Sequence, residues 1–343
     1  MLPILAALVP SQNFAICSIV ASTTISSATG GNWNCFNNAP ANPICLGSVS
    51  TWVGITCKAG VVQQVKLAGL KLRGSLPSQI GLLTDLTALN LEGNSLTNSI
   101  PSSIGQDSLL TSLDLGDNSL TGNIPSALAS LGPLVSLNLG QNSLTGTIPT
   151  KLSQLSALTN LDLSGNGLTG PLGALPILPS LQALNLSGNS ILGSIPNAIA
   201  NLNQLTSLDL SKNRIGGTIP SVLGQLTALR SLNLDSNSLV GSVPSTLGNL
   251  PQLTYLDVGN NMLTGALPSQ LCSSTVVTLV YGFTSLSCGV PTAGTRLLLF
   301  VHPFESHLIL CCLFVTRSRI TQRQHNPLQA SIYLEVCSYF STI

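Results

Sequence analysis

Apolar residues recur along most of the chain in the order LxxLxLxxN, which is followed by LTGxIP. The segment LTSLDLGDNSLTGNIPSAL, which begins at Leu110, returns with few changes at Leu134 and at Leu205. Aligned on the asparagine, the copies lie 24, 24, 24, 23, 24, 24 and 24 residues apart. A further, degenerate unit begins at Val62. Self-similarity at such a period indicates a solenoid of stacked coils.

Each repeat predicts one short strand. The leucines alternate with polar residues, so that Leu113 and Leu115 point into the core and Asp114 points outward. Glycine in LTG and proline in IP favour turns, and the return segment suits one 3₁₀ or α turn. Nine coils at about 4.8 Å give a parallel sheet about 40 Å long. Eight of its strands are expected to begin near positions 86, 110, 134, 158, 181, 205, 229 and 253.

The fifth unit departs from this pattern. It reads NGLTGPLGALPILPSL from Asn166, is one residue shorter than the others, and contains Pro171, Pro176 and Pro179. Its leucines still fall on the inner face, which places the deletion on the convex return. The concave sheet is therefore expected to pass through this unit without a break.

The recurring asparagine is flanked by apolar residues and is expected to turn inward with them. Its amide both donates and accepts hydrogen bonds, so a column of asparagines can satisfy the backbone of neighbouring turns. We predict that a buried ladder of these side chains stabilises every bend. The ladder would consist of Asn94, Asn118, Asn142, Asn166, Asn189, Asn213, Asn237 and Asn261.

The pattern LxxLxLxxN-xLTGxIPxxLxxLxx resembles the plant-type leucine-rich repeat across most of the chain. The resemblance implies an α/β repeat solenoid, a right-handed superhelix with a parallel β-sheet on its concave face. It also implies an extracellular recognition module, similar to receptor-like ectodomains or to polygalacturonase inhibitors. The partners implied are protein, peptide or cell-wall glycan ligands bound on the concave face, together with a co-receptor.

The resemblance and the shifts in composition divide the chain into five segments. Trp33 and Trp52 lie where the N-terminal cap of this family shields the first coil, and the composition changes again after the repeats. The expected segments are a leader with the start of the cap (1–27), the N-terminal cap (28–61), nine leucine-rich repeats (62–271), the C-terminal cap (272–295) and a tail (296–343).

Cysteines lie in both regions that resemble caps. In this family a disulfide closes each cap, which implies a bond from Cys57 to Cys45, with Cys35 as the alternative partner. At the other end the resemblance implies a bond between Cys272 and Cys288. Disulfides are typical of an oxidising, extracellular compartment.

Both ends of the chain leave alternatives open. Residues 1–27 contain an apolar stretch suited to a secretory signal but no basic residue before it, so a gene model that lacks its true first exon is the alternative. In the tail, residues 297–315 have the length of a membrane crossing, but Glu305 and two histidines offset their apolar character. The tail is therefore a single-pass anchor, an ill-packed segment or an extension of the cap.

The composition excludes several classes of function. Only 7% of the residues are charged and the formal net charge is +1, so no basic field attracts nucleic acid. All three histidines lie beyond residue 300, which leaves the repeats without the commonest general base and metal ligand. Neither a nucleophile beside a base nor cysteine pairs at zinc spacing stand out. We expect no enzyme, no cofactor and no bound metal.

The exposed strand positions form the recognition surface of a solenoid. Here they are almost all asparagine or aspartate, which is typical of solvated strands. Binding sites favour arginine and large aromatic residues, and Arg230 and Tyr255 place both on adjacent coils near the C-terminal end. The candidate ligand-binding residues are Arg230, Tyr255, Lys212, Asp235, Asp209 and Asp257.

A candidate glycosylation site lies on the same face. Asn185-Leu-Ser is a sequon with a permitted middle residue. A glycan on Asn185 would obstruct the middle coils and direct a ligand towards either end of the sheet.

Two classes of function therefore remain. One is a recognition module, secreted or anchored in the plasma membrane, with no kinase motif in the chain. The other is a structural or surface-coating secreted protein that contacts polysaccharide or ice, for which the neutral Ser, Thr and Asn exterior argues. A discrete protein captured from extracellular extract supports the first hypothesis, and retention by insoluble glycan or ice alone supports the second.

Overall fold

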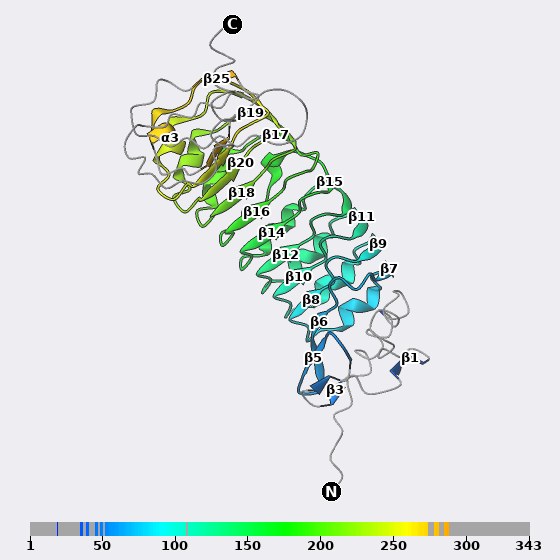
Figure 1. The fold of residues 1–343 in the computed structure, drawn as a ribbon. Coiled ribbons are helices and arrows are strands. Elements are labelled where there is room, and N and C mark those ends of the chain that lie inside the picture. Colours follow the sequence, from blue (N-terminus) through cyan, green and yellow to red (C-terminus); the bar gives the residue numbers. More distant parts are fainter. Residues whose placement is uncertain are drawn as a thin grey trace, which may run out of the picture.

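The computed structural model is an elongated stack of similar coils (Figure 1). Each coil has a strand on the concave face, a turn, a second strand on the outer side and a short helix that returns to the next coil. This is the architecture of a leucine-rich-repeat solenoid, as the sequence predicts. The structure describes Ile19 and residues 35–36, 39–40, 45–46, 49–50, 52–107, 109–273, 278–280 and 285–287.

The concave face carries an 11-stranded sheet in the order β24-β22-β20-β18-β16-β14-β12-β10-β8-β6-β5. Parallel neighbours pair residues 24 positions apart, as Ser112 does with Ser136, and 23 apart at the fifth repeat and between β22 and β24. The predictions of strand position and of an unbroken sheet are confirmed, although each strand begins two residues late. The bounds are β5 (Ile55–Lys58), β6 (Val61–Lys66), β8 (Ala88–Asn90), β10 (Ser112–Asp114), β12 (Ser136–Asn138), β14 (Asn160–Asp162), β16 (Ala183–Asn185), β18 (Ser207–Asp209), β20 (Ser231–Asn233), β22 (Tyr255–Asp257) and β24 (Thr278–Val280).

Two five-stranded parallel sheets cover the outer side, where the sequence predicted only turns. They are separate because the fifth repeat joins them by a single bridge between Pro171 and Leu192, and proline has no N–H for a ladder. The bounds of the first sheet are β7 (Arg73–Ser75), β9 (Ser95–Ser99), β11 (Ser119–Asn123), β13 (Ser143–Gly146) and β15 (Gly167–Leu168). Those of the second are β17 (Leu192–Ser194), β19 (Arg214–Thr218), β21 (Ser238–Gly241), β23 (Met262–Ala266) and β25 (Ser285–Ser287).

Short 3₁₀ helices return the chain from coil to coil. A proline with extended backbone precedes each of them and stops the outer strand, as Pro125 does at φ −66° and ψ 127°. The α-helix α3 (Ser269–Ser273) follows the last outer turn, and no helix among the described residues is long and apolar enough to cross a membrane. The 3₁₀ helices are η1 (Ser78–Leu82), η2 (Ser102–Gln106), η3 (Ser126–Ser130), η4 (Thr150–Gln154), η5 (Leu172–Ala174), η6 (Asn197–Asn201), η7 (Ser221–Gln225) and η8 (Ser245–Asn249).

Leucines from successive coils form one continuous core along the stack. In the coil that contains β10, Leu113, Leu115 and Leu120 are fully buried, and the equivalent residues of the neighbouring coils pack above and below them. Burying one such side chain contributes about 1.5–3 kcal/mol, so about seven apolar side chains in one coil contribute about 10–20 kcal/mol. Ordering the residues of one coil costs more, at about 1.5 kcal/mol for each residue. The coils are therefore stable only as an array.

The recurring asparagines bind the backbone of two coils at once. Asn142 Oδ1 accepts the N–H of Leu120 at 2.9 Å, and its Nδ2 donates to the carbonyls of Leu115, Leu139 and Gly140 at 3.0, 3.2 and 3.1 Å. All eight asparagines of the column make the same set of contacts, from Asn94 to Asn261. Each side chain thus holds its own turn and the turn of the preceding coil.

The N-terminal end of the stack is closed by β5, which pairs antiparallel with β6. Trp52 is buried there, and Cys45 and Cys57 form a disulfide with 5.7 Å between their Cα atoms. This is the pairing that the family resemblance implied, with Cys45 rather than Cys35. Two small sheets precede it, formed by β1 (Cys35–Phe36) with β2 (Ala39–Pro40) and by β3 (Cys45–Leu46) with β4 (Val49–Ser50).

Several sequence predictions concern residues outside the described ones. They are the leader, apart from Ile19, the role of Trp33, the bond between Cys272 and Cys288, and the membrane-length segment 297–315. These remain predictions.

The ladder gives a direct test of stability. Replacing Asn142 with alanine leaves the turn groups of two coils unsatisfied, at about 1–3 kcal/mol for each buried group. We expect the free energy of unfolding to fall by at least about 2 kcal/mol in urea denaturation. Ser143→Ala, at an exposed neighbouring position, should change it by no more than about 0.5 kcal/mol. Equal midpoints for the two variants would contradict the role given to the ladder.

Candidate functional site

The outward positions of the concave strands form one column in which asparagine and aspartate alternate. Cross-strand pairing places these residues directly opposite one another from strand to strand. In the Asn and Asp members, Oδ1 accepts the backbone N–H two residues later, as Asp114 does from Gly116 at 3.1 Å. These bonds fix the side chains before any ligand arrives. The column is Lys66, Asn90, Asp114, Asn138, Asp162, Asn185, Asp209, Asn233 and Asp257.

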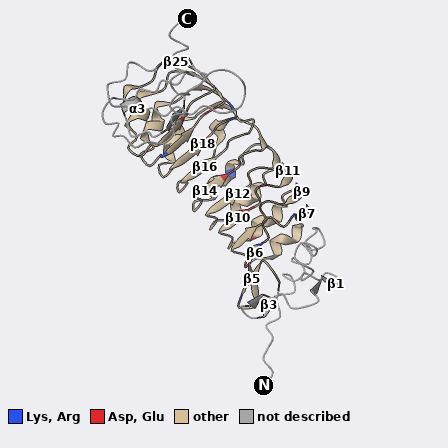
Figure 2. Cartoon of the chain, in the orientation of Figure 1, with Lys and Arg blue, Asp and Glu red and all other residues tan. Residues whose placement is uncertain are grey.

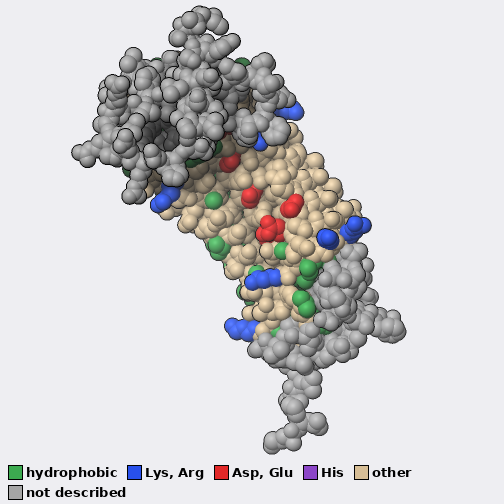
Figure 3. Space-filling view, viewed as in Figure 1, with side chains coloured by type: hydrophobic (Ala, Val, Ile, Leu, Met, Phe, Trp, Pro, Cys, Tyr) green, Lys and Arg blue, Asp and Glu red, His purple; other side chains and the backbone are tan. Residues whose placement is uncertain are grey.

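Hydrogen bonds also link amide and carboxylate along the column. Asn185 Nδ2 donates to Asp162 Oδ2 at 3.2 Å, and Asn233 Nδ2 donates to Asp209 Oδ2 at 3.1 Å. The carboxylates lie two strands apart, about 9.6 Å, so their repulsion is weak. Charged residues are sparse in Figure 2, and Figure 3 shows the acidic ones gathered in the middle of the described surface. The concave sheet therefore carries a regular row of negative charge.

The aromatic candidate lies at the C-terminal end of this row. The Tyr255 hydroxyl donates to Asp257 Oδ2 at 3.2 Å. Burial, and then the charge of Asp257, raises the pKa of Tyr255 to about 12. Burial also raises the pKa of Asp257, although hydrogen bonds from Gly259 and Tyr255 oppose the change. The tyrosine is neutral at physiological pH and offers a ring face beside a carboxylate.

Arg230, the basic candidate, lies diagonally from Tyr255. Tyr255 pairs with Ser231, and the carbonyl of Arg230 accepts the N–H groups of Thr254 and Tyr255 at 2.8 and 3.0 Å. Arg230 is exposed and lies one residue before Ser231, so it is one position farther from the aspartate column than Tyr255 is. The two residues lie on adjacent coils, as the sequence indicates, but not directly opposite each other.

The remaining two candidates lie on the turns that follow the concave strands. The N–H of Lys212 donates to the carbonyl of Asp235 at 2.8 Å, and its side chain is exposed. The Asp235 carboxylate accepts bonds from Asn260 Nδ2 at 2.7 Å and from Ser236 Oγ at 2.8 Å. Both residues border the concave face at one edge rather than lying on it.

The sequon residue Asn185 belongs to the aspartate and asparagine column. Its Nδ2, the atom that a glycan would occupy, donates to Asp162, and its Oδ1 accepts bonds from the N–H and Oγ of Ser187. In the folded chain this nitrogen is therefore engaged. Glycosylation of Asn185 remains a prediction.

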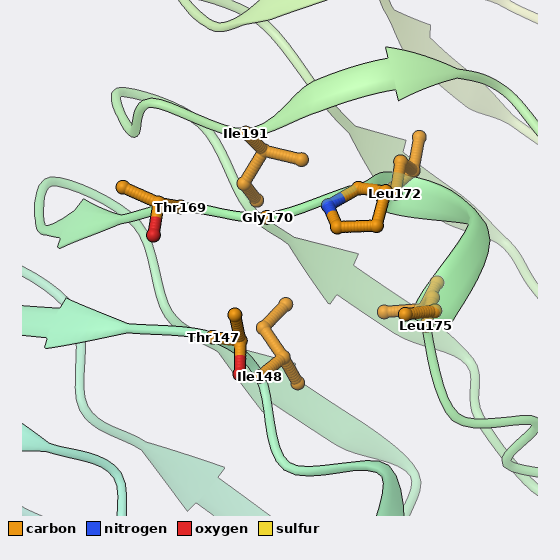
Figure 4. Close-up of a pocket in the computed structure, with 9 residues that line it drawn as sticks. Thr147, Ile148, Thr169, Gly170, Leu172, Leu175 and Ile191 are labelled. Carbon is orange, nitrogen blue, oxygen red and sulfur yellow. The ribbon is translucent and has the colours of Figure 1, made fainter.

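A small apolar cleft lies on the outer side, at the break between the two outer sheets (Figure 4). Its lining holds no ionisable side chain. No group of three or more His, Cys, Asp or Glu residues that could hold a metal ion occurs among the described residues. The polar, charged and aromatic groups that could bind a ligand therefore lie on the concave face and not in this cleft. The lining consists of Thr147, Ile148, Thr169, Gly170, Pro171, Leu172, Ala174, Leu175 and Ile191.

One unusual residue escaped the sequence analysis. Asp107 is fully buried, at a position where the neighbouring repeats have leucines such as Leu83 and Leu131. The signal was present in the sequence, because the column of leucines after each IPxxL segment is interrupted there by an acid. The alternating hydrogen bonds of the concave column were also missed, because they join residues a whole repeat apart.

Comparisons with known proteins agree with the repeat architecture. A leucine-rich-repeat family model matches residues 108–168, 173–215 and 204–263, and a second one matches residues 85–106. A comparison with curated protein sequences gave no match.

Solved structures similar to the chain include receptors and an ice-binding protein. The ectodomain of the Arabidopsis thaliana receptor kinase GASSHO1/SCHENGEN3, in complex with CASPARIAN STRIP INTEGRITY FACTOR 2, is 34% identical with a TM-score of 0.70, over 80% of this chain and 33% of that one. A TDR receptor is 29% identical, TM-score 0.51, over 69% and 55%. A plant ice-binding protein is 26% identical, TM-score 0.65, over 82% and 89%. The chain thus spans one third to about half of the receptor chains.

The bond between Tyr255 and Asp257 can be tested by titration. Replacing Tyr255 with phenylalanine removes an O–H that stabilises the ionised carboxylate, so the pKa of Asp257 should rise further. Carboxyl chemical shifts in an NMR titration measure it. The pKa of Asp114, on a distant strand, should not change. A lower pKa of Asp257 in the variant would contradict the bond.

Proposed function

Because this chain belongs to the leucine-rich repeat family, we propose that it is an extracellular recognition module for an extended, basic segment of a protein or peptide. The observation that carries the proposal is the row of carboxylates on the concave sheet, from Asp114 to Asp257. Their side chains are fixed by hydrogen bonds, so little conformational entropy is lost on binding.

The spacing of the row favours one kind of ligand. The carboxylates recur every two strands, about 9.6 Å apart. A polyproline II segment advances about 3.1 Å per residue and presents every third side chain on the same face, about 9.3 Å apart. A segment with lysine or arginine at every third position therefore matches the row of Asp114, Asp162, Asp209 and Asp257.

The C-terminal end of the row supplies further contacts. Tyr255 offers a ring face, which attracts a cationic side chain as well as an apolar one. Arg230, one column away, offers a planar guanidinium to a carboxylate such as a peptide C-terminus. We place the docking site on the C-terminal half of the sheet, with Lys212 and Asp235 at its edge.

Two findings support an extracellular location and the binding of a separate partner. The Cys45–Cys57 disulfide is typical of extracellular proteins. The similar ectodomain of GASSHO1/SCHENGEN3 was solved in complex with CASPARIAN STRIP INTEGRITY FACTOR 2, a partner distinct from the receptor chain.

Two observations favour the alternative hypothesis of a surface-coating protein that contacts ice or polysaccharide. The plant ice-binding protein matches this chain over most of both lengths. The first outer sheet is uncharged apart from Arg73 and presents exposed serine and threonine hydroxyls, on strands about 4.8 Å apart. Such a face suits ice or polysaccharide, and it lies away from the carboxylate row. Across the strands Thr97 pairs with Ser119, and Ser99 pairs with Thr121, which pairs with Ser143. Ser95 and Thr145 are further exposed hydroxyl residues of this sheet, and Thr169 follows its last strand.

A synthetic peptide with arginine at every third position tests the recognition module. We expect it to bind at least fivefold more tightly than a peptide of equal composition with its arginines clustered at one end. Tyr255→Ala and Asp209→Asn should each weaken binding at least about fivefold, as hot-spot changes of about 1 kcal/mol do. Calorimetry or fluorescence anisotropy at fixed salt measures these affinities.

The matched control is Thr87→Ala, at the far end of the sheet, which should leave the affinity within about twofold. Equal affinity for the two peptides would refute the spacing argument. A larger loss from Thr87→Ala than from Tyr255→Ala would place the site at the other end. If neither peptide binds but the protein inhibits ice recrystallisation, and Thr121→Asn with Thr145→Asn abolishes that inhibition, the surface-coating hypothesis replaces this one.

A further inference from the structure

In the coil that contains η2, the usual order of a buried apolar residue and an exposed polar residue is reversed. After the 3₁₀ helix the neighbouring repeats place a leucine in the core, whereas this coil has Asp107. Two residues later the others have small or polar residues, whereas this coil has Leu109, which is 48% exposed. The core leucines are Leu83, Leu131, Leu155, Leu178, Leu202, Leu226 and Leu250. The residues equivalent to Leu109 are Asp85, Pro133, Ala157, Ser180, Gln204, Ala228 and Gln252.

The backbone at Asp107 follows the same path as at the leucines. Its φ and ψ are −79° and 73°, against −80° and 63° at Leu131. The Asp107 carbonyl accepts the N–H of Leu110 at 3.0 Å, as the Leu131 carbonyl accepts that of Leu134 at 2.9 Å. The carboxyl is therefore directed into the place of a leucine side chain.

The surroundings of the Asp107 carboxyl are apolar. The side chain is 0% exposed, and neither Oδ1 nor Oδ2 has a hydrogen-bond partner among the described residues. The helices that pack on either side, η1 and η3, have no charged residue. Asp85 follows η1, and Asp114 lies on the outward side of β10 in the same coil. Burial is what raises the pKa of Asp107, to about 8.

We propose that this coil is a two-state switch, in which Asp107 and Leu109 exchange places between core and solvent when the Asp107 carboxyl ionises. In the acidic state the protonated carboxyl is buried and Leu109 is exposed. In the alkaline state the carboxylate reaches water and Leu109 fills the space between Leu83 and Leu131. The second state restores the pattern of the other coils, with an apolar side chain inside and a polar one outside.

The direction of the pH dependence follows from the pKa. Burial raises it from 3.8 to about 8, so the acidic state holds a proton that the unfolded chain releases between these values. The folding equilibrium constant of the acidic state is therefore greatest below about pH 4, and it falls about tenfold per pH unit up to about pH 8. The exchange limits this loss, because the alkaline state needs no proton on Asp107.

The variant Leu109→Ala separates the two states. At pH 5 Leu109 is exposed, so its truncation should change the folding equilibrium constant no more than about twofold. At pH 9 the same side chain fills the core, and its loss should lower the constant at least about tenfold. Urea denaturation at both pH values measures the two constants. Val135→Ala, at a site that is 42% exposed on a neighbouring coil, should have equal effects at pH 5 and pH 9.

Asp107→Leu should lock the acidic geometry. In this background the fall in stability between pH 5 and pH 9 should disappear, and Leu109→Ala should be neutral at both pH values. An equal effect of Leu109→Ala at pH 5 and pH 9 in the otherwise unchanged chain would overturn the proposal. So would a pH dependence that survives Asp107→Leu.

Hydrogen exchange of the unsubstituted chain provides a measurement that needs no variant. Because the exchange of Asp107 with Leu109 changes the local backbone, the exchange rate of a peptide spanning residues 104–112 should differ at least about threefold between pH 5 and pH 9, after correction for the intrinsic rate. The equivalent peptide 128–136, with Leu131 in the core position, should show no such difference. Equal protection of the two peptides at both pH values would contradict the switch.

Discussion

The structure depends on how one side chain per coil satisfies the backbone of the inner turns. Those turns carry N–H and C=O groups into an apolar core, where an unpaired group costs free energy. The asparagine amide pairs with them, and its contacts reach the preceding coil, as Asn142 reaches Leu115 and Leu120. The turn groups of one coil are therefore all paired only when a second coil lies beside it.

Because the core and the turns depend on leucine and asparagine, the surface residues can differ between proteins with this fold. Leucine fills the core and the inward asparagine binds the turns, while the side chains of the outward strand positions lie on the surface. On the concave side those positions form the fixed row of carboxylates, with Tyr255 at one end. On the outer side they include exposed serines and threonines. The two proposed functions use different faces, so experiments can separate them.

Much of the fold follows from the sequence because its determinants are local and periodic. The strand positions came from the alternation around Leu113 and Leu115, and the cap disulfide from the family resemblance. The outer strands were missed because LTGxIP reads as a turn, and becomes a strand only when the next coil lies beside it. The bonds from Asn185 to Asp162 and from Asn233 to Asp209 were missed for the same reason. Asp107 could have been found from the interrupted leucine column.

The central claim is that an extended basic segment lies along the concave sheet, and cross-linking tests it most directly. An amine-reactive cross-linker can join the amino terminus of the periodic arginine peptide to lysines of the protein. Lys66 and Lys212 border the concave sheet, whereas Lys151 lies on η4 of the return segment. We predict that mass spectrometry finds links to Lys66 or Lys212 and none to Lys151. Links mainly to Lys151 would contradict the account.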